Sequence, residues 1–128
     1  MKQALAVVII TLNEERYIAR CLASVQSFAD EIIVLDAFSS DRTVEICQSF
    51  GARVEQRKWE GYAASKNYLN SLAQADYILS LDADEALSSA LISEIQTVKE
   101  TGFKGVYNVN RLTSYCGKWI RHSGWLRS

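Results

Sequence analysis

The sequence predicts an α/β fold in which a mostly parallel β-sheet lies between layers of helices. Short apolar runs rich in Val, Ile and Leu alternate along the chain with segments whose apolar residues recur at helical spacing. Alternation of this kind is typical of βαβ units, which build parallel sheets. At 128 residues and 48% hydrophobic content, the chain has the size and composition of one globular domain.

The first βα unit is predicted by the apolar run Ala4–Ile10, which is continuous enough for a strand covered on both faces. Asn13 is a good N-cap residue, and Glu14 and Glu15 behind it favour the positive end of a helix. We therefore expect a helix to begin directly after Asn13. Four apolar residues at i, i+3, i+4 and i+7 would form its buried face: Ile18, Cys21, Leu22 and Val25.

The next two strands are predicted at Glu31–Leu35 and Ala52–Gln56. Between them, cap residues at positions 38–41 precede a second helix, and Gly51 suits the left-handed residue that follows a helix end. The residues of this helix that we expect to face inward are Val44, Cys47 and either Ile46 or Phe50.

The second half of the chain continues the alternation. The elements expected there are a helix at Ala63–Ala73, a strand at Tyr77–Leu81 and a helix capped by Ser88 or Ser89 and ended by Gly102. The apolar sides of the two helices are Leu69, Leu72 and Ala73, and then Leu91, Ile95 and Val98. A looser strand pattern suited to a sheet edge covers Gly105–Leu112, and residues 113–128 show no clear periodicity.

Composition excludes several classes of protein. The formal net charge is -1, from 14 basic and 15 acidic residues, so no nucleic-acid partner bound by broad phosphate neutralisation is expected. The cysteines Cys21, Cys47 and Cys116 lie far apart without Cys-x-x-Cys spacing, which argues against a disulfide framework or a zinc site and fits a reducing compartment. No apolar run approaches the roughly 20 residues of a membrane span.

Polar side chains follow three of the predicted strands. The three clusters are Thr11, Asn13 and Glu14; Asp36, Ser39 and Asp41; and Asp82, Asp84 and Glu85. Parallel strands bring their carboxyl ends to one edge, where ligands bind in such sheets. Asp82 and Asp84 are two residues apart, a spacing that suits one divalent cation shared with the phosphates of a ligand. A strand that ends in a solvated acidic turn is the alternative interpretation.

Residues 7–14, 34–43 and 81–85 resemble the motifs of family 2 glycosyltransferases, which have the GT-A fold. Trp59–Tyr62, Lys66 and Asn67 add a similarity to the bacterial branch that adds a sugar to the lipopolysaccharide inner core. The resemblance covers residues 4 to 125. It implies a GT-A-type, Rossmann-like α/β/α sandwich that is incomplete on its C-terminal, acceptor side.

The resemblance also implies roles for individual residues. Thr11, Asn13 and Glu14 match a loop along the base and ribose of the nucleotide, and Asp36 matches an acid that helps to hold the base. Lys66 matches a basic position near the diphosphate, followed by Asn67. Asp82 and Asp84 match the Asp-x-Asp pair around Ala83, with Asp84 binding Mg²⁺ or Mn²⁺ and Asp82 close to the ribose and the metal. From pattern alone, a solvated helix lysine at Lys66 is an equal interpretation.

The sequence departs from the family pattern at two places and ends early. Leu12 stands where the family has Pro, and Ala37-Phe38 replaces an Asp-Gly pair, so one acid that reads the base is missing. The family's general base lies downstream of the Asp-x-Asp strand. We therefore expect the general base to be absent from this chain. Glu85 and His122 are the only nearby candidates, and a role for Glu85 in capping the next helix or orienting the metal site is favoured. Trp119 and Trp125 either stack on a sugar or pack in the core. We expect residues 1–112 to be a nucleotide-sugar-binding domain and residues 113–128 to be the truncated start of an acceptor region.

The resemblance therefore predicts an inverting transfer from a nucleoside-diphosphate sugar, a UDP-hexose, to a lipopolysaccharide-core, other glycan or lipid-linked acceptor. A cytoplasmic location, peripheral attachment to the inner face of the membrane and a homodimer formed through an exposed sheet edge are further expectations. A catalytically incomplete binding or interaction module is the main alternative. A nucleotidyltransferase would need a Gly-rich loop after the first strand, which 11–15 lacks, and a phosphatase would place Asp-x-Asp after the first strand.

Overall fold

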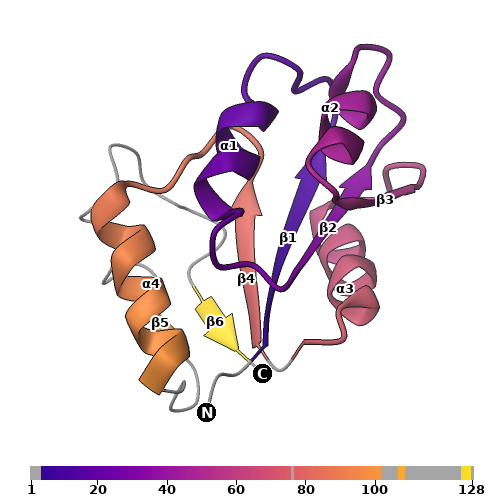
Figure 1. Ribbon diagram of the computed structural model, residues 1–128. Helices are drawn as coiled ribbons and strands as arrows, with labels where there is room; N and C mark the ends of the chain where they lie inside the picture. Colours follow the sequence, from indigo (N-terminus) through magenta and orange to yellow (C-terminus); the bar gives the residue numbers. More distant parts are fainter. Residues whose placement is uncertain (1–3, 76, 102–106, 109–124, 128) are drawn as a thin grey trace.

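The computed structural model describes residues 4–75, 77–101, 107–108 and 125–127, and over these residues the chain forms a six-stranded sheet with helices on both faces (Figure 1). The strands are β1 (Leu5–Thr11), β2 (Glu31–Asp36), β3 (Arg53–Gln56), β4 (Tyr77–Asp82), β5 (Tyr107–Asn108) and β6 (Trp125–Arg127). The helices are α1 (Ile18–Val25), α2 (Thr43–Ser49), α3 (Tyr62–Leu72) and α4 (Ser89–Thr101). The strand order is β3-β2-β1-β4-β6-β5. β1 to β4 are parallel and β6 is antiparallel to both neighbours, which confirms the mostly parallel α/β fold.

Two apolar cores, one on each face of the sheet, explain the continuous apolar run of β1. On one face, Leu5, Val7 and Ile9 pack in a cluster with buried residues of α1, α2 and α4. On the other face, Val8 packs in a cluster with Leu69 of α3. Because alternate residues of a strand point to opposite faces, a strand buried on both faces is apolar throughout. Cys21 and Cys47 are fully buried in the first cluster, as their positions on apolar helix faces predicted.

The predicted start of the first helix is wrong. Asn13 does not cap a helix, because α1 begins only at Ile18 with Tyr17 as its N-cap residue. Asn13 instead adopts a left-handed conformation with φ 53°, and its Oδ1 accepts a hydrogen bond of 2.8 Å from the backbone N–H of Ser40. A contact with a residue 27 positions away thus replaces the local cap that the sequence suggested.

Other helix ends agree with the sequence. Gly51 follows α2 with φ 80°, the left-handed conformation expected after a helix end. Of the two candidates for the cap of α4, Ser88 is the one whose Oγ accepts a hydrogen bond of 3.2 Å, from the N–H of Leu91.

The C-terminal part of the chain contributes a strand that the sequence analysis missed. β6 pairs with β4, with Ile78 opposite Arg127, and β5 then pairs with β6. Three residues are too short for a period-2 pattern to be visible. Within the looser strand expected at Gly105–Leu112, the structure describes Tyr107–Asn108 as strand. Several positions named in the sequence analysis lie outside the described residues: Gly102, Gly105, Leu112, Cys116, Trp119 and His122.

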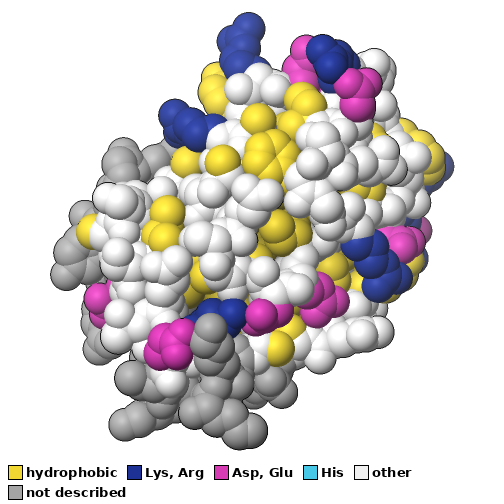
Figure 2. All heavy atoms as spheres, viewed as in Figure 1, with side chains coloured by type: hydrophobic (Ala, Val, Ile, Leu, Met, Phe, Trp, Pro, Cys, Tyr) yellow, Lys and Arg dark blue, Asp and Glu magenta, His cyan; other side chains and the backbone are white. Residues whose placement is uncertain are grey.

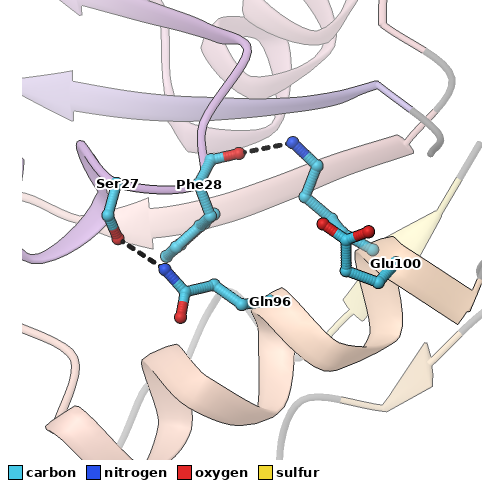
Figure 3. Close-up of a pocket in the computed structure, with 5 residues that line it drawn as sticks. Ser27, Phe28, Gln96 and Glu100 are labelled. Atoms are coloured by element: carbon cyan, nitrogen blue, oxygen red, sulfur yellow. Dashed lines mark hydrogen bonds between the residues drawn. The ribbon is translucent and has the colours of Figure 1, made fainter.

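α4 is tied to the loop between α1 and β2 by a buried lysine. Lys99 Nζ donates hydrogen bonds to the backbone oxygen of Phe28 at 2.7 Å and to Asp30 Oδ2 at 2.6 Å. Nearby, Gln96 Nε2 donates a hydrogen bond of 3.1 Å to Ser27 Oγ. Together with Phe28 and Lys99, these two residues line one surface hollow (Figure 3). The methylene stem of the lysine is buried while its charge is paired, which is the arrangement that makes a buried lysine tolerable. In the described part of the chain, none of the helices is long and apolar enough to cross a membrane.

Candidate functional site

The register of the sheet brings the predicted polar residues into one row. Thr11 lies opposite Asp36 across the β1–β2 pair, and Ile10 lies opposite Asp82 across the β1–β4 pair. The chain runs outward from β1 through β2 to β3 and then returns to the other side of β1 as β4. In an open parallel sheet, the loops at such a reversal of strand order diverge and leave a crevice at the carboxyl ends. The candidate site is therefore the carboxyl end of β1 and β4.

Asp36 is the centre of a hydrogen-bond network beside this point. Its side chain is fully buried, yet its two oxygens accept bonds from four donors. Oδ1 accepts from the hydroxyls of Thr11 at 2.7 Å and Ser39 at 2.5 Å, and Oδ2 accepts from the N–H of Ser39 at 2.8 Å and Gln56 Nε2 at 3.2 Å. Burial alone would raise the pKa of Asp36, but the bonds from Ser39, Thr11 and Gln56 outweigh it and hold the pKa below its usual value.

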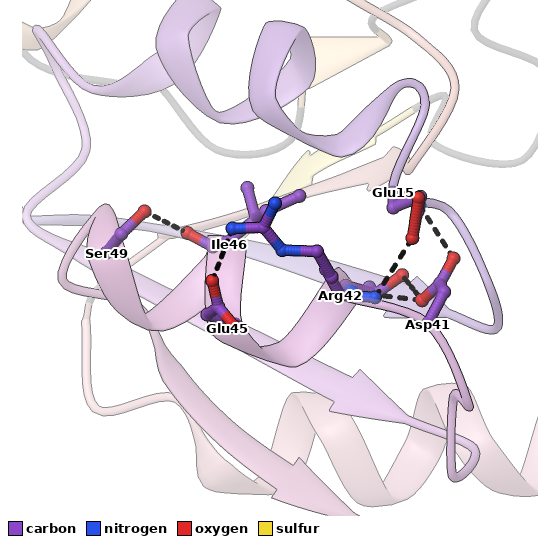
Figure 4. A network of polar contacts seen from close by, with 7 residues as sticks. Glu15, Asp41, Arg42, Glu45, Ile46 and Ser49 are labelled. Atoms are coloured by element: carbon purple, nitrogen blue, oxygen red, sulfur yellow. Dashed lines mark hydrogen bonds and ion pairs between the residues drawn. The ribbon is translucent and has the colours of Figure 1, made fainter.

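The loop after β1 and the loop after β2 are fastened to each other by further bonds. Ser39 Oγ accepts from the N–H of Asn13 at 2.8 Å, and Thr43 Oγ1 accepts from the N–H of Glu14 at 2.8 Å. Asp41 Oδ2 accepts from the N–H of Glu15, whose own carboxylate accepts from the N–H of Arg42 (Figure 4). Because these bonds satisfy backbone groups in both loops, the loops form one unit that holds the wall of the crevice.

The strand end at β4 keeps two carboxylates near solvent and turns the third inward. Asp82 and Asp84 are half-buried, whereas Ala83 is 3% exposed and Glu85 is 2% exposed. Glu85 Oε1 accepts a hydrogen bond of 3.1 Å from the N–H of Asp82, and the N–H of Glu85 donates to the backbone oxygen of Asp82 at 3.0 Å. Glu85 thus closes the turn that presents the other two acids.

The start of α3 lies within electrostatic reach of this acidic end. Burial lowers the pKa of Lys66 to about 8, and the negative charge of Asp82 opposes that shift. Burial, followed by the charges of Asp82 and Glu85, raises the pKa of Tyr62 to about 12. Lys66 Nζ lies over the Tyr62 ring, 5.2 Å from its centroid. The charge of Asp82 acts on Lys66, and the role of Lys66 near the diphosphate stays a prediction. Asn67, the next residue on α3, is exposed.

The donor atoms at the strand end fit a cation that a ligand helps to hold. Among the described residues, no three His, Cys, Asp or Glu side chains are grouped closely enough to hold a metal ion by themselves. Asp82 and Asp84 supply carboxylate oxygens, the ligand type that Mg²⁺ and Mn²⁺ prefer. A magnesium-like ion usually takes one or two carboxylates and completes its shell with phosphate oxygens and water. Two carboxylates beside Lys66 suit that arrangement.

The same edge carries exposed apolar side chains, whose exposure the sequence did not predict. In the described part of the chain, the exposed large apolar side chains all belong to the loops after β1, β2 and β3 or to the first residues after them: Leu12, Tyr17, Phe38, Trp59 and Tyr62. An open hollow beside them is lined by Asn13, Glu15, Arg16 and Tyr17. Figure 2 shows one face of the molecule, on which hydrophobic and charged side chains are interspersed. Exposed aromatic groups next to paired acids suit a ligand that has both a ring and a charge.

The comparison with protein families decides the family. The model described as "Glycosyl transferase family 2" matches residues 6–127. The chain belongs to glycosyl transferase family 2. An uncharacterised glycosyltransferase of Rickettsia bellii is 44% identical over 90 residues, which are 70% of this chain and 31% of that protein. The lipopolysaccharide core biosynthesis glycosyltransferase LpsC of Rhizobium meliloti is 35% identical over 95 residues, 70% of this chain and 35% of LpsC. The chain spans about a third of the length of these relatives.

Solved structures place this family 2 chain in the GT-A fold. Glucosyl-3-phosphoglycerate synthase of Mycobacterium tuberculosis, in complex with Mn²⁺, UDP and phosphoglyceric acid, matches 98% of this chain with a TM-score of 0.72. The two sequences are 19% identical, and the match covers 56% of the synthase, so the likeness concerns the fold. The GT-A-type fold that the resemblance predicted is thereby confirmed.

Proposed function

We propose that this chain binds a nucleoside-diphosphate sugar at the carboxyl ends of β1 and β4, as the donor-binding and metal-binding half of an inverting glycosyltransferase. The observation that carries the proposal is the position of Asp82 and Asp84 at the reversal of strand order, where the charge of Asp82 acts on Lys66. Membership of the family supports a nucleotide-sugar donor. The UDP bound to the M. tuberculosis synthase supports uracil as the base and a UDP-hexose as the donor.

In this proposal each residue acts on one part of the donor. Asp84, with Asp82, would hold Mg²⁺ or Mn²⁺, which would supply Lewis-acid stabilisation of the departing diphosphate. Lys66 adds a fixed positive charge at the same place. Thr11, Asn13 and Glu14 form the wall along the base and ribose together with Asp36, whose buried carboxylate acts by holding that wall in shape. Ala83 and Asn67 complete the lining.

The proposed acceptor is the lipopolysaccharide core, another glycan or a lipid-linked glycan. The similarity to LpsC supports this choice. A lipid-linked acceptor would bring the protein to the inner face of the cytoplasmic membrane as a peripheral protein. The homodimer expected from an exposed edge remains part of the proposal, although the edge strand β3 is short and carries the ion pair Arg53–Glu55, features that discourage pairing between edges.

A catalytically incomplete sugar-nucleotide-binding module is the second candidate, and the position of Glu85 favours it. A general base must reach the hydroxyl from which it takes a proton. Glu85 is buried and bonded to the N–H of Asp82, an arrangement that suits support of the metal site better than contact with an acceptor. Under this second function the chain binds the donor and transfers nothing.

Calorimetric titration with UDP, with and without Mn²⁺, tests the shared part of both candidates. We expect binding that depends on Mn²⁺ and that the Asp84→Ala variant loses. Glu94→Ala, which removes an exposed acid from α4, is the matched control and should bind UDP like the parent chain. Failure of the parent to bind any nucleoside diphosphate, or equal binding by the Asp84→Ala variant, contradicts the proposal. A transfer assay with a UDP-hexose and a lipopolysaccharide-core acceptor then separates the transferase from the binding module.

A further inference from the structure

Two residues of α3, one turn apart, form a pair that faces the acidic end of β4. Tyr62 and Lys66 are related by i, i+4 spacing, which puts them on the same side of the helix. Lys66 Nζ lies 5.2 Å from the centroid of the Tyr62 ring, within the range of a cation–π interaction. Tyr62 is 39% exposed, so its ring lies at the surface and is not part of the core.

The helix that carries this pair is fixed to the sheet on its other side. Leu69 of α3 is fully buried and packs with Val8 and Ile33 of the sheet. Gly61 occupies the N-cap position of α3 with φ 98°, a backbone conformation that glycine adopts readily and other residues rarely adopt. This conformation fixes where the first turn of α3 begins. The backbone of α3 is therefore held in place, whereas the long side chain of Lys66 has four rotatable bonds and needs a contact to hold its end.

We propose that the ring of Tyr62 is a positioning residue, which holds the Lys66 ammonium at the carboxyl end of β4 where it meets the diphosphate of the donor. This inference rests on the proposed function. The ring supplies a face of negative potential that attracts the ammonium without neutralising it. A carboxylate in the same place would pair with Lys66 and compete with the diphosphate for it. An aromatic ring holds the charge and leaves it free to act on the ligand.

The influence of Asp82 on both side chains supports this geometry. Its charge opposes the burial that lowers the pKa of Lys66, and it adds to the burial that raises the pKa of Tyr62. Both members of the pair therefore sense the same carboxylate at the proposed metal site. A second cation–π pair joins Arg57, in the loop after β3, to the ring of Tyr68 of α3 at 4.0 Å. The Tyr68 ring provides a matched control on the same helix.

Calorimetric titration with UDP and Mn²⁺ tests the inference through four variants. Tyr62→Phe keeps the ring and should bind UDP within about twofold of the parent, whereas Tyr62→Leu removes the ring and should bind about three- to tenfold more weakly. Lys66→Met should weaken binding at least as much. The double variant Tyr62→Leu/Lys66→Met should bind no more weakly than Lys66→Met alone, since the ring acts through the lysine.

A merely structural role of Tyr62 would give a different pattern. Tyr68→Leu, the control that removes the ring of the second pair, should leave UDP affinity near that of the parent, and thermal unfolding of every variant shows whether it is folded. Additive losses in the double variant, a Tyr62→Phe variant as weak as Tyr62→Leu, or parent-like binding by Tyr62→Leu would overturn the inference alone. Failure of the parent chain to bind UDP would overturn the proposed function, and this inference with it.

Discussion

Replacing Asp36 with Asn changes one oxygen of a fully buried carboxylate into an NH₂ group and leaves its size unchanged. The orientation of the new amide is determined by the donors around it. Oδ2 faces the N–H of Ser39, which cannot rotate, whereas Oδ1 faces the hydroxyls of Thr11 and Ser39, which can turn and accept. The NH₂ group should therefore take the place of Oδ1.

The cost follows from the bonds that change. Hydrogen bonds to a charged group contribute about 1.5–3 kcal/mol each, and neutral bonds contribute about 0.5–1.5 kcal/mol. In the Asn variant, all four hydrogen bonds are made to a neutral amide in place of a charged carboxylate. At the Oδ1 position the new NH₂ group must donate, so the hydroxyls of Thr11 and Ser39 become acceptors. Allowing for non-additivity within one network, we expect Asp36→Asn to lower the free energy of unfolding by about 2 kcal/mol. Asp36→Ala leaves buried donors without acceptors and should cost about 3–5 kcal/mol.

The difference between parent and variant should depend on pH, because the pKa of Asp36 is lowered in the folded chain. The stability that this carboxylate contributes is fully present above its unfolded pKa of about 3.9 and is lost as the pH falls through the lower folded value. The Asp36→Asn variant does not titrate there, so the gap should shrink in acid.

Urea unfolding of parent and variant at pH 7, and in steps down to about pH 3, measures this gap. Asp41→Asn is the control, since Asp41 accepts bonds from Thr43 and Glu15 nearer the surface and should contribute less. Equal stability of parent and Asp36→Asn at pH 7 would refute the reasoning, as would a gap that stays constant in acid.

Three further outcomes follow from single contacts. Lys99→Met keeps the buried stem but removes the hydrogen bond to the backbone oxygen of Phe28. Urea unfolding should show a free energy of unfolding lower by about 1–3 kcal/mol. An unchanged free energy would contradict the proposal that Lys99 fastens α4 to the loop before β2. Gly51→Ala places an alanine at φ 80°, where no atom lies within 4 Å of the added Cβ. The free energy of unfolding should therefore fall only by the cost of the left-handed backbone, about 1 kcal/mol in the same assay. Burial raises the pKa of the Cys21 thiol, and it raises the pKa of the Cys47 thiol to about 11. Peptide mapping should therefore find both thiols unmodified by iodoacetamide at pH 8 until urea is added. Rapid labelling of either thiol in the folded protein would refute its burial.

The strands and the polar strand ends were predictable because their signals are local. β1 to β4 lie within one residue of the predicted runs, and the continuous apolar sequence of β1 reflects its burial on both faces. The start of α1 was not predictable, because the partner of Asn13 is Ser40, in a loop that meets it only in the folded chain. β6 was not predicted, because a strand of three residues is too short to show the alternation of apolar and polar residues. Asp36 was predicted at the site, but one of its four donors is Gln56 at the end of β3, whose role has no sequence signal.

The site itself depends on a property that no single stretch of sequence encodes, the order of the strands. Had β4 joined the sheet beyond β3, two strands would separate Asp82 and Asp84 from β1, and Lys66 would face other residues. Because β4 returns beside β1, α3 crosses the opposite face from α1 and brings Lys66 to the acidic strand end, while the loop unit held by Asp36 forms the facing wall. The acidic triplet at 82–85 thus gains its proposed role in donor binding from the reversal of strand order, and a solvated turn of the same sequence elsewhere in the sheet would lack both the lysine and the wall.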